Sequence, residues 1–183
     1  MAPGVRLIQK VSSTRAFARI APHVIPVMDR TVHRLTRGRV MLSAQMLPGL
    51  VLTVRGARSG QLRTVPLACM PRWRPQGGPR EESHDGRSDG PQGGPRKGLP
   101  ESWILVGSNF GRAGHPAWTA NLLGCPDAVV SWKGQDVRVR ARLLQGGERA
   151  EVWEEALRFW PPYATYQARI EREIRLFRLD RRD

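Results

Sequence analysis

The stretch from Leu50 to Leu67, LVLTVRGARSGQLRTVPL, most constrains the fold, because it predicts two strands joined by a tight basic turn. An apolar run rich in β-forming residues occupies positions 50–54, and a second such run resumes after the turn. Gly56 and Gly60 permit the positive φ that a sharp reversal needs. We therefore expect the chain to build on an antiparallel hairpin.

The same turn carries groups that suit an anion. Ser59 offers a hydroxyl, and successive backbone N–H groups in such a turn can converge on an oxyanion. Arg58 and Arg63 add guanidinium groups, whose planar forks fit phosphate or carboxylate. Taken alone, the turn favours an ordinary hairpin with solvated arginines over an anion site. The features that favour an anion site lie further along the chain.

A second segment, residues 102–144, begins with a predicted buried strand at 103–106. Gly107-Ser108-Asn109 closes that strand with small polar residues that can approach a ligand. His115-Pro116 then opens a helix, because proline at an early helical position lacks only an N–H that the helix does not need. Cys125-Pro126 ends it.

One face of this helix can carry both an aromatic plate and an amide. Trp118 and Leu122 are four residues apart, as are Ala117 and Asn121. The rest of the chain predicts strands at 128–132 and 137–144, a helix at 148–160, a short helix from Tyr163, and a last strand at 174–179. The strand at 137–144 alternates apolar residues with arginines, which is typical of a solvated outer face.

The charge balance requires an anionic partner. Among 183 residues, 30 Lys and Arg against 16 Asp and Glu give a net charge of +14. Nucleic acid, a membrane surface and an acidic small molecule all satisfy this charge. Cys69 and Cys125 lack metal or disulfide spacing, and the four histidines show no ligand spacing, so we expect no metal and a reducing cytoplasm.

Two segments differ from the rest of what we expect to be one domain at 41–183. Residues 1–40 hold eight Lys or Arg against one acid and predict a basic helix, either packed on the domain or resting on anionic lipid. Residues 74–99 are rich in Pro, Gly and Arg and fall in a stretch where PQGGPR occurs twice, which indicates a disordered insertion in a hairpin.

Three motifs in this order carry a resemblance to a known family. GARSGQLRTVPL, then SNFGRAGHPAWTANL, then WPPYATYQ resembles the deazaflavin-dependent nitroreductases, which use coenzyme F420. The resemblance runs from about Arg34 to the C-terminal strand. It implies a split β-barrel of the flavin-reductase or pyridoxamine-phosphate-oxidase type, with an N-terminal helix and C-terminal helices. It also implies an oxidoreductase that passes a hydride from F420H2 to a quinone, nitroaromatic or activated enone.

The resemblance also implies which residues meet the cofactor. Residues matching those that hold the phosphate and tail are Arg58, Ser59, Gly60, Arg63 and Thr64, with Ser108 and Asn109 as a second tail contact. Residues matching those that line the ring are Val65, Pro66, His115, Pro116, Ala117, Trp118 and Asn121. Tyr163 and Tyr166 match aromatic positions of the substrate pocket and are the candidate catalytic residues, with packing as the alternative role.

Other functions remain open at this point. A flavin mononucleotide (FMN) phosphate would also suit the basic turn, so an FMN-binding oxidoreductase of the same barrel is the runner-up. A non-enzymatic cofactor-binding or nucleic-acid-binding protein comes third, because the arginine-faced strand has no aromatics for base stacking. We expect a small-molecule acceptor, no nucleic acid, and a cytoplasmic protein whose N-terminal helix is a candidate contact with anionic membrane. The oligomeric state is not predicted.

Overall fold

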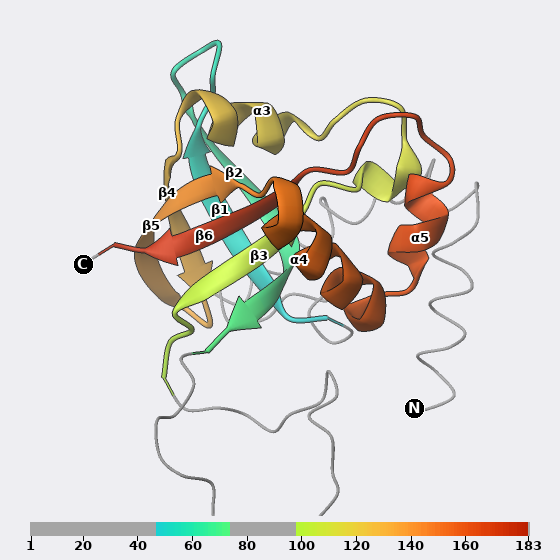
Figure 1. Cartoon of the computed structure of the whole chain (residues 1–183). Coiled ribbons are helices and arrows are strands. Elements are labelled where there is room, and N and C mark those ends of the chain that lie inside the picture. Colours follow the sequence, from blue (N-terminus) through green and yellow to red (C-terminus); the bar gives the residue numbers. More distant parts are fainter. Residues whose placement is uncertain (1–46, 74–97, 183) are drawn as a thin grey trace, which may run out of the picture.

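The computed structural model describes residues 47–73 and 98–182. These residues form a barrel of six antiparallel strands, with helices at one end and on its outer side (Figure 1). The strands are β1 (Gly49–Arg55), β2 (Leu62–Arg72), β3 (Ser102–Val106), β4 (Asp127–Trp132), β5 (Gln135–Leu143) and β6 (Leu176–Arg181). The helices are α3 (Ala117–Gly124), α4 (Gly146–Phe159) and α5 (Pro162–Gln167), with a short 3-10 turn, η2 (Asn109–Gly111). The predicted helical segment at 1–40 and nearly all of the insertion at 74–99 lie outside the described residues.

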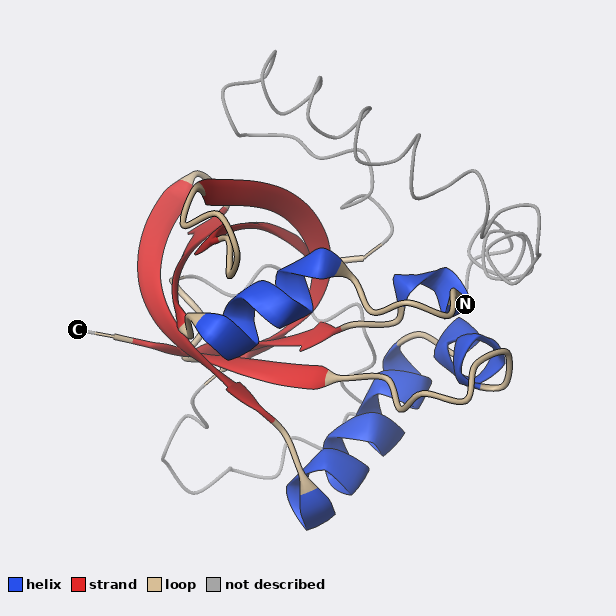
Figure 2. Ribbon diagram, turned by 90° about the horizontal axis from the view of Figure 1, so that it is seen from above, coloured by secondary structure: helices blue, strands red, loops and turns tan. Residues whose placement is uncertain are grey.

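The strands close into a ring in the order β1-β2-β3-β6-β5-β4, and β4 pairs back onto β1 (Figure 2). Every neighbouring pair is antiparallel. The expected β-barrel with helices is confirmed.

The predicted hairpin is β1 and β2, paired from Gly49↔Ala68 to Arg55↔Leu62. β2 continues well beyond the predicted second run and pairs with β3 up to Arg72↔Ser102. The connection that carries the predicted insertion therefore joins two paired antiparallel strands. It leaves β2 at the end opposite the basic turn.

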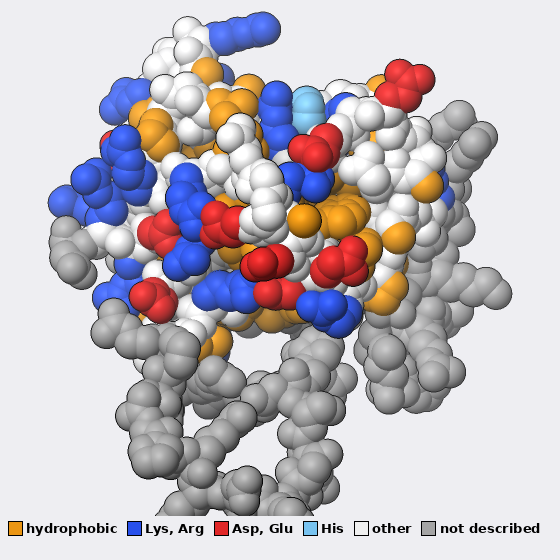
Figure 3. All heavy atoms as spheres, viewed as in Figure 1, with side chains coloured by type: hydrophobic (Ala, Val, Ile, Leu, Met, Phe, Trp, Pro, Cys, Tyr) orange, Lys and Arg blue, Asp and Glu red, His pale blue; other side chains and the backbone are white. Residues whose placement is uncertain are grey.

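β5 shows the alternation that its sequence predicts. Its inward side chains Val137, Val139 and Ala141 are buried, while the arginines between them are exposed. Arg142 donates to both carboxylate oxygens of Glu148, at 2.6 and 2.5 Å. Acidic and basic side chains interleave where β5, β6 and α4 meet (Figure 3). The arginine face is thus a partly neutralised barrel exterior.

The barrel has a core inside and a second core outside. The inner core gathers inward residues of all six strands together with Trp118 and Leu122 of α3, which covers one end of the ring. The outer core lies between the outward residues Met70 and Ile104 and the helices α4 and α5. Because strand side chains alternate, neighbours such as Trp103 and Ile104 belong to different cores.

Several element boundaries differ from those predicted. α4 begins at Gly146, two residues before the predicted start, and β6 begins at Leu176 rather than at residue 174. The backbone N–H of Ile174 donates to the Gln167 side-chain Oε1 at 2.9 Å, so this residue is bound to α5 rather than to a strand. Within residues 47–73 and 98–182, no helix has the length and apolar character to cross a bilayer.

Candidate cofactor site

The basic turn between β1 and β2 is held by its own backbone. The Gly56 N–H donates to the Gln61 carbonyl and the Gly60 N–H to the Gly56 carbonyl, both at 2.8 Å. Gly60 has φ +67°, and a Cβ on Gly56 would lie 2.9 Å from Ser59 Oγ, so both positions favour glycine. The turn is consequently compact and fixed in shape.

Two backbone donors of this turn remain available. The N–H groups of Arg58 and Ser59 have no hydrogen-bond partner within residues 47–73 and 98–182. Both residues are exposed at the turn and line a cavity. An anion placed there would therefore meet unsatisfied donors as well as the Arg58 guanidinium.

Strand register decides which residues of β2 face that cavity. Arg63 lies opposite Val54, and Val65 lies opposite Leu52, so both share the inward face of the barrel. Arg63 is nevertheless exposed, because it stands at the mouth of the barrel. Thr64 takes the opposite face, where its Oγ1 lies 3.3 Å from that of Thr53.

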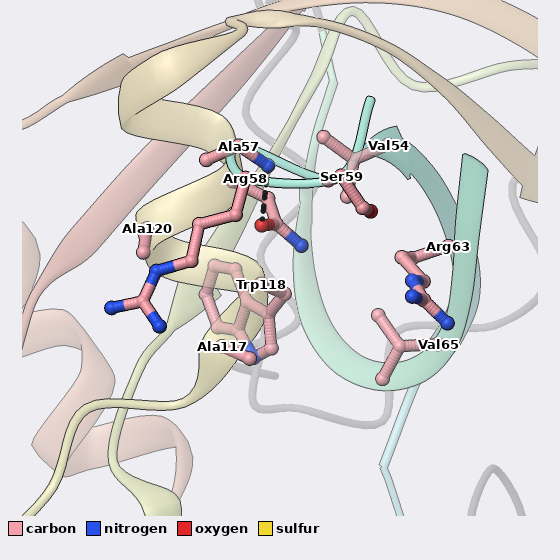
Figure 4. Close-up of a pocket in the computed structure, with 11 residues that line it drawn as sticks. Val54, Ala57, Arg58, Ser59, Arg63, Val65, Ala117, Trp118 and Ala120 are labelled. Atoms are coloured by element: carbon pink, nitrogen blue, oxygen red, sulfur yellow. Dashed lines mark hydrogen bonds between the residues drawn. The ribbon is translucent and has the colours of Figure 1, made fainter. Parts of the chain in front are cut away.

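Helix α3 is tied to the turn at one point. The Ala57 N–H donates to the side-chain Oδ1 of Asn121 at 3.0 Å, drawn as the dashed line in Figure 4. A Cβ on Gly124 would lie 3.1 Å from Ala57 Cβ, so the end of the helix also approaches the turn closely. The hydrogen bond and this close approach fix the position of the turn relative to the helix.

A cavity of about 700 Å³ lies between the turn, β2 and α3 (Figure 4). Arg58, Ala117, Trp118 and Ala120 border one side, and Val54, Arg63 and Val65 border the other. Trp118 is held by an edge-to-face contact with Phe177, with ring centroids 5.7 Å apart. The residues that line the cavity are Val54, Gly56, Ala57, Arg58, Ser59, Arg63, Val65, Ala117, Trp118, Ala120 and Asn121.

The structure therefore brings half of the predicted cofactor residues into the lining of this cavity. Those that line the cavity are Arg58, Ser59, Arg63, Val65, Ala117, Trp118 and Asn121. Gly60 shapes the turn, and Pro116 precedes the first turn of α3. Thr64 and Pro66 share the face of β2 that points away from the inward Arg63 and Val65, and neither lines the cavity.

The loop from Gly107 to His115 lies beside the start of α3 without lining the cavity. Asn109 donates through its side-chain nitrogen to the Gly114 carbonyl at 2.8 Å, which closes the loop on itself. His115 Nδ1 lies 3.2 Å from a guanidinium nitrogen of Arg172. Burial and the charges of Arg172 and Arg175 lower the pKa of His115, so its imidazole is neutral at neutral pH.

The two predicted catalytic tyrosines lie elsewhere. Tyr163 and Tyr166 lie on α5 with their rings in contact, and both are buried in the outer core rather than in the cavity lining. Tyr163 packs on Trp153, and Tyr166 packs edge-to-face on Phe110. Burial raises the pKa of Tyr163. Their catalytic role stays a prediction.

Several residues of the site carried no clear signal in the sequence. Val54, Ala57 and Ala120 line the cavity, yet only the strand register and the helix position reveal them. Arg172 is the largest omission, because it binds backbone carbonyls that no motif marks. No group of three or more potential metal-ligating side chains occurs in the part of the chain that the structure describes.

Comparison with known proteins shows which family the chain resembles. The profile of one family, described as F420H(2)-dependent quinone reductase, matches residues 91–180. A solved structure titled "Structure of F420-H2 Dependent Reductase (FDR-A)" is 28% identical, with a TM-score of 0.51, over 73% of this chain and 94% of that one. Over residues 91–180 the chain resembles the F420H2-dependent quinone reductase family.

A second solved structure agrees with this assignment of fold. It is described as a domain-swapped dimer, is 26% identical, and aligns with a TM-score of 0.53 over 82% of this chain and 95% of that one. The match to the F420H2-dependent quinone reductase family indicates an oxidoreductase on a split β-barrel, as the motifs of the chain predicted.

Proposed function

We propose that the cavity between the basic turn and α3 binds F420H2, and that the protein passes a hydride from it to a small organic acceptor. A quinone, a nitroaromatic or an activated enone is the expected class of acceptor. The observation that carries the proposal is that Arg58, Arg63 and the free N–H groups of the turn border the same cavity as the apolar wall of Trp118 and Val65.

The donors at the turn match the anionic part of such a cofactor. Its phosphate and glutamate carboxylates need charged and backbone donors, which Arg58, Ser59 and Arg63 supply. These groups stand at the mouth of the barrel, so a long tail can continue into solvent. The cavity volume of about 700 Å³ is in the range of pockets that hold cofactors of this size.

The apolar side of the cavity suits a flat ring. Val54, Val65 and Ala117 offer hydrocarbon surface, and Trp118 adds an aromatic wall fixed by its contact in the barrel core. When bound there, the reduced deazaflavin supplies the hydride. The residues around it orient the ring and keep water away from the reacting face.

A fluorescence titration tests the proposal directly. The chain has six tryptophans, and Trp118 borders the cavity, so cofactor binding should quench emission. Arg58→Ala and Arg63→Ala should each weaken F420H2 binding roughly tenfold to hundredfold, because each removes a charge-assisted hydrogen bond. Arg138→Ala, on the outer face of β5, is the matched control and should bind as the parent protein does.

The same titration separates the alternative functions. Tighter binding of FMN than of F420H2 would indicate an FMN-dependent reductase of the same barrel instead. Binding of F420H2 with no turnover of quinones, nitroaromatics or enones would indicate a protein that only holds the cofactor. Unchanged affinity in both arginine variants would exclude the basic turn as the anion site.

A further inference from the structure

We infer that Arg172 is a positioning residue that fixes the 107–115 loop and sets the tautomer of His115 so that Nε2 carries the proton. The effect of Arg172 on cofactor binding and turnover rests on the proposed function, whereas its effect on the loop and on His115 does not. Arg172 lies between α5 and β6, far in sequence from the loop that it holds.

A single guanidinium gathers the loop. Arg172 Nε donates to the Ala113 carbonyl at 2.9 Å, and Nη2 donates to the carbonyls of Ser108 and Arg112 at 3.1 and 3.0 Å. Nη1 lies 3.4 Å from the Gly107 carbonyl. A planar, five-donor group is the side chain that can serve so many acceptors in one loop.

The remaining contact fixes the histidine. Arg172 Nη1 lies 3.2 Å from His115 Nδ1, and a guanidinium only donates, so Nδ1 is the acceptor. A neutral imidazole that accepts at Nδ1 carries its proton on Nε2. His115 Nε2 has no partner within the described ranges 47–73 and 98–182, and it is therefore a donor available to a ligand.

The surrounding charges keep the ring neutral. The cationic groups that act on His115 are Arg172 and Arg175, and after burial their charges lower its pKa. Arg175 is bound separately, since its Nη1 donates to Thr119 Oγ1 at 3.2 Å. Arg175 thus contributes charge near His115 but no hydrogen bond to the ring.

The loop is connected to the cavity through the start of α3. His115 precedes Pro116, whose carbonyl accepts from both the N–H and the Oγ1 of Thr119 at 3.0 and 2.8 Å. Ala117 and Trp118, the next residues, line the cavity. His115, which carries this Nε2–H donor, thus stands two residues before Ala117, the first lining residue of α3, and we expect the donor to meet a carbonyl, carboxylate or phosphate oxygen of a bound cofactor.

Nitrogen NMR of the histidines, without cofactor, tests the positioning role. His115 is assigned by comparison with His115→Asn among the four histidines. In Arg172→Met, we expect the Nδ1–H tautomer to become populated and the amides of residues 107–115 to exchange hydrogen at least tenfold faster. Arg172→Lys keeps the charge and one donor, so it should restore part of the exchange protection and provides a second variant if the methionine protein folds poorly.

Arg175→Gln is the matched control. It removes a neighbouring positive charge and should raise the pKa of His115, yet it should leave the Nε2–H tautomer and the loop exchange unchanged. If the parent Nε2–H signal and loop exchange persist in both Arg172 variants, the inference is wrong. The same holds if Arg175→Gln changes the tautomer as much as Arg172→Met does.

Cofactor titration then separates this inference from the proposed function. If the parent binds F420H2, Arg172→Met should lower turnover roughly tenfold to hundredfold through misplacement of the α3 entrance. If the parent binds no F420H2, the proposed function fails while the tautomer and exchange results still decide the role of Arg172. Parent-like affinity and turnover in Arg172→Met would overturn its role at the cofactor.

Discussion

The backbone N–H of Ala57 donates to the side-chain oxygen of Asn121, which lies 64 residues further along the chain. This bond fixes the position of the basic turn relative to the helix that bears Trp118. The phosphate end and the ring end of the proposed cofactor site are therefore held at one distance before any ligand arrives.

Removal of the Asn121 side-chain acceptor should weaken cofactor binding more than it destabilises the fold. Asn121→Ala is expected to cost about 1 kcal/mol in the free energy of unfolding, the size of one hydrogen bond. The affinity for F420H2 should fall roughly tenfold, because binding must then also order the turn. Urea denaturation and the fluorescence titration measure the two effects.

Leu123→Ala is the control on the same helix, since Leu123 is 48% exposed. It should change neither quantity appreciably. Equal affinity in Asn121→Ala and the parent would show that the turn holds its position without α3.

Substitution of Gly60 should lower the stability of the protein through the backbone conformation alone. Its φ is +67° and its added Cβ would meet nothing, so Gly60→Ala isolates the backbone penalty, which is about 1 kcal/mol. Gly147, inside α4, also has open space but no positive φ, and Gly147→Ala should stabilise by roughly 0.5–1 kcal/mol. Thermal and urea unfolding of both variants should therefore shift in opposite directions.

The buried phenol of Tyr163 should make the protein sensitive to alkali. Because burial raises its pKa in the folded state, the folded protein keeps the proton to higher pH than the unfolded chain does. Its contribution is complete below about pH 10, the ordinary tyrosine value, and falls above that by up to about 1.4 kcal/mol per pH unit.

Urea unfolding at about pH 9 and about pH 11 checks this for the parent and Tyr163→Phe. The phenylalanine variant should lose less stability between the two, while lysine ionisation affects both proteins alike. We also expect its turnover to remain near that of the parent, given its place outside the cavity lining. A loss of turnover with intact stability would instead support the catalytic role predicted from the motif.

The ion pair between β5 and α4 should be measurable but small. Arg142 and Glu148 are partly exposed, with 44% and 42% of their side chains accessible, so Arg142→Gln should cost about 0.5–1 kcal/mol. High salt should remove most of that difference. Arg138→Gln, on the same face and without an ion partner among the described residues, is the control and should be nearly neutral.

A double-mutant cycle with Glu148→Gln isolates the pair itself. A coupling energy near zero would mean that Arg142 acts through its other contact, with Asp180 at 3.5 Å, or through packing alone.

Local pattern predicted most of the elements correctly, because their signals are contained within a few residues. The alternation in β5, the glycines of the first turn, and the helix that starts after Pro116 each follow from backbone geometry and side-chain period. The strands predicted at 128–132 and 137–144 are likewise present as β4 and β5, and Lys133 and Gly134 form the turn between them with φ of 49° and 82°.

Contacts between distant segments were beyond such patterns. Arg172 binds four backbone carbonyls, which every residue type possesses, so nothing in the sequence distinguishes it from a solvated arginine. Tyr163 and Tyr166 were predicted to line the substrate pocket, but which surface they would cover depended on the path of α5 across the barrel. For Thr64 and Pro66, strand alternation alone separates them from Val65, whereas the family pattern had made all three cofactor contacts.

The 11 residues of β2 separate the basic turn, which ends at Leu62, from the connection that leaves after Arg72. At roughly 3.3 Å per residue, the turn and the connection stand about 35 Å apart along a strand that pairs first with β1 and then with β3. We therefore expect a change in the length of the connection to leave the cavity unchanged. This makes the connection a suitable place to insert an affinity tag or a fluorophore, at which the protein could be immobilised or followed without disturbing cofactor exchange.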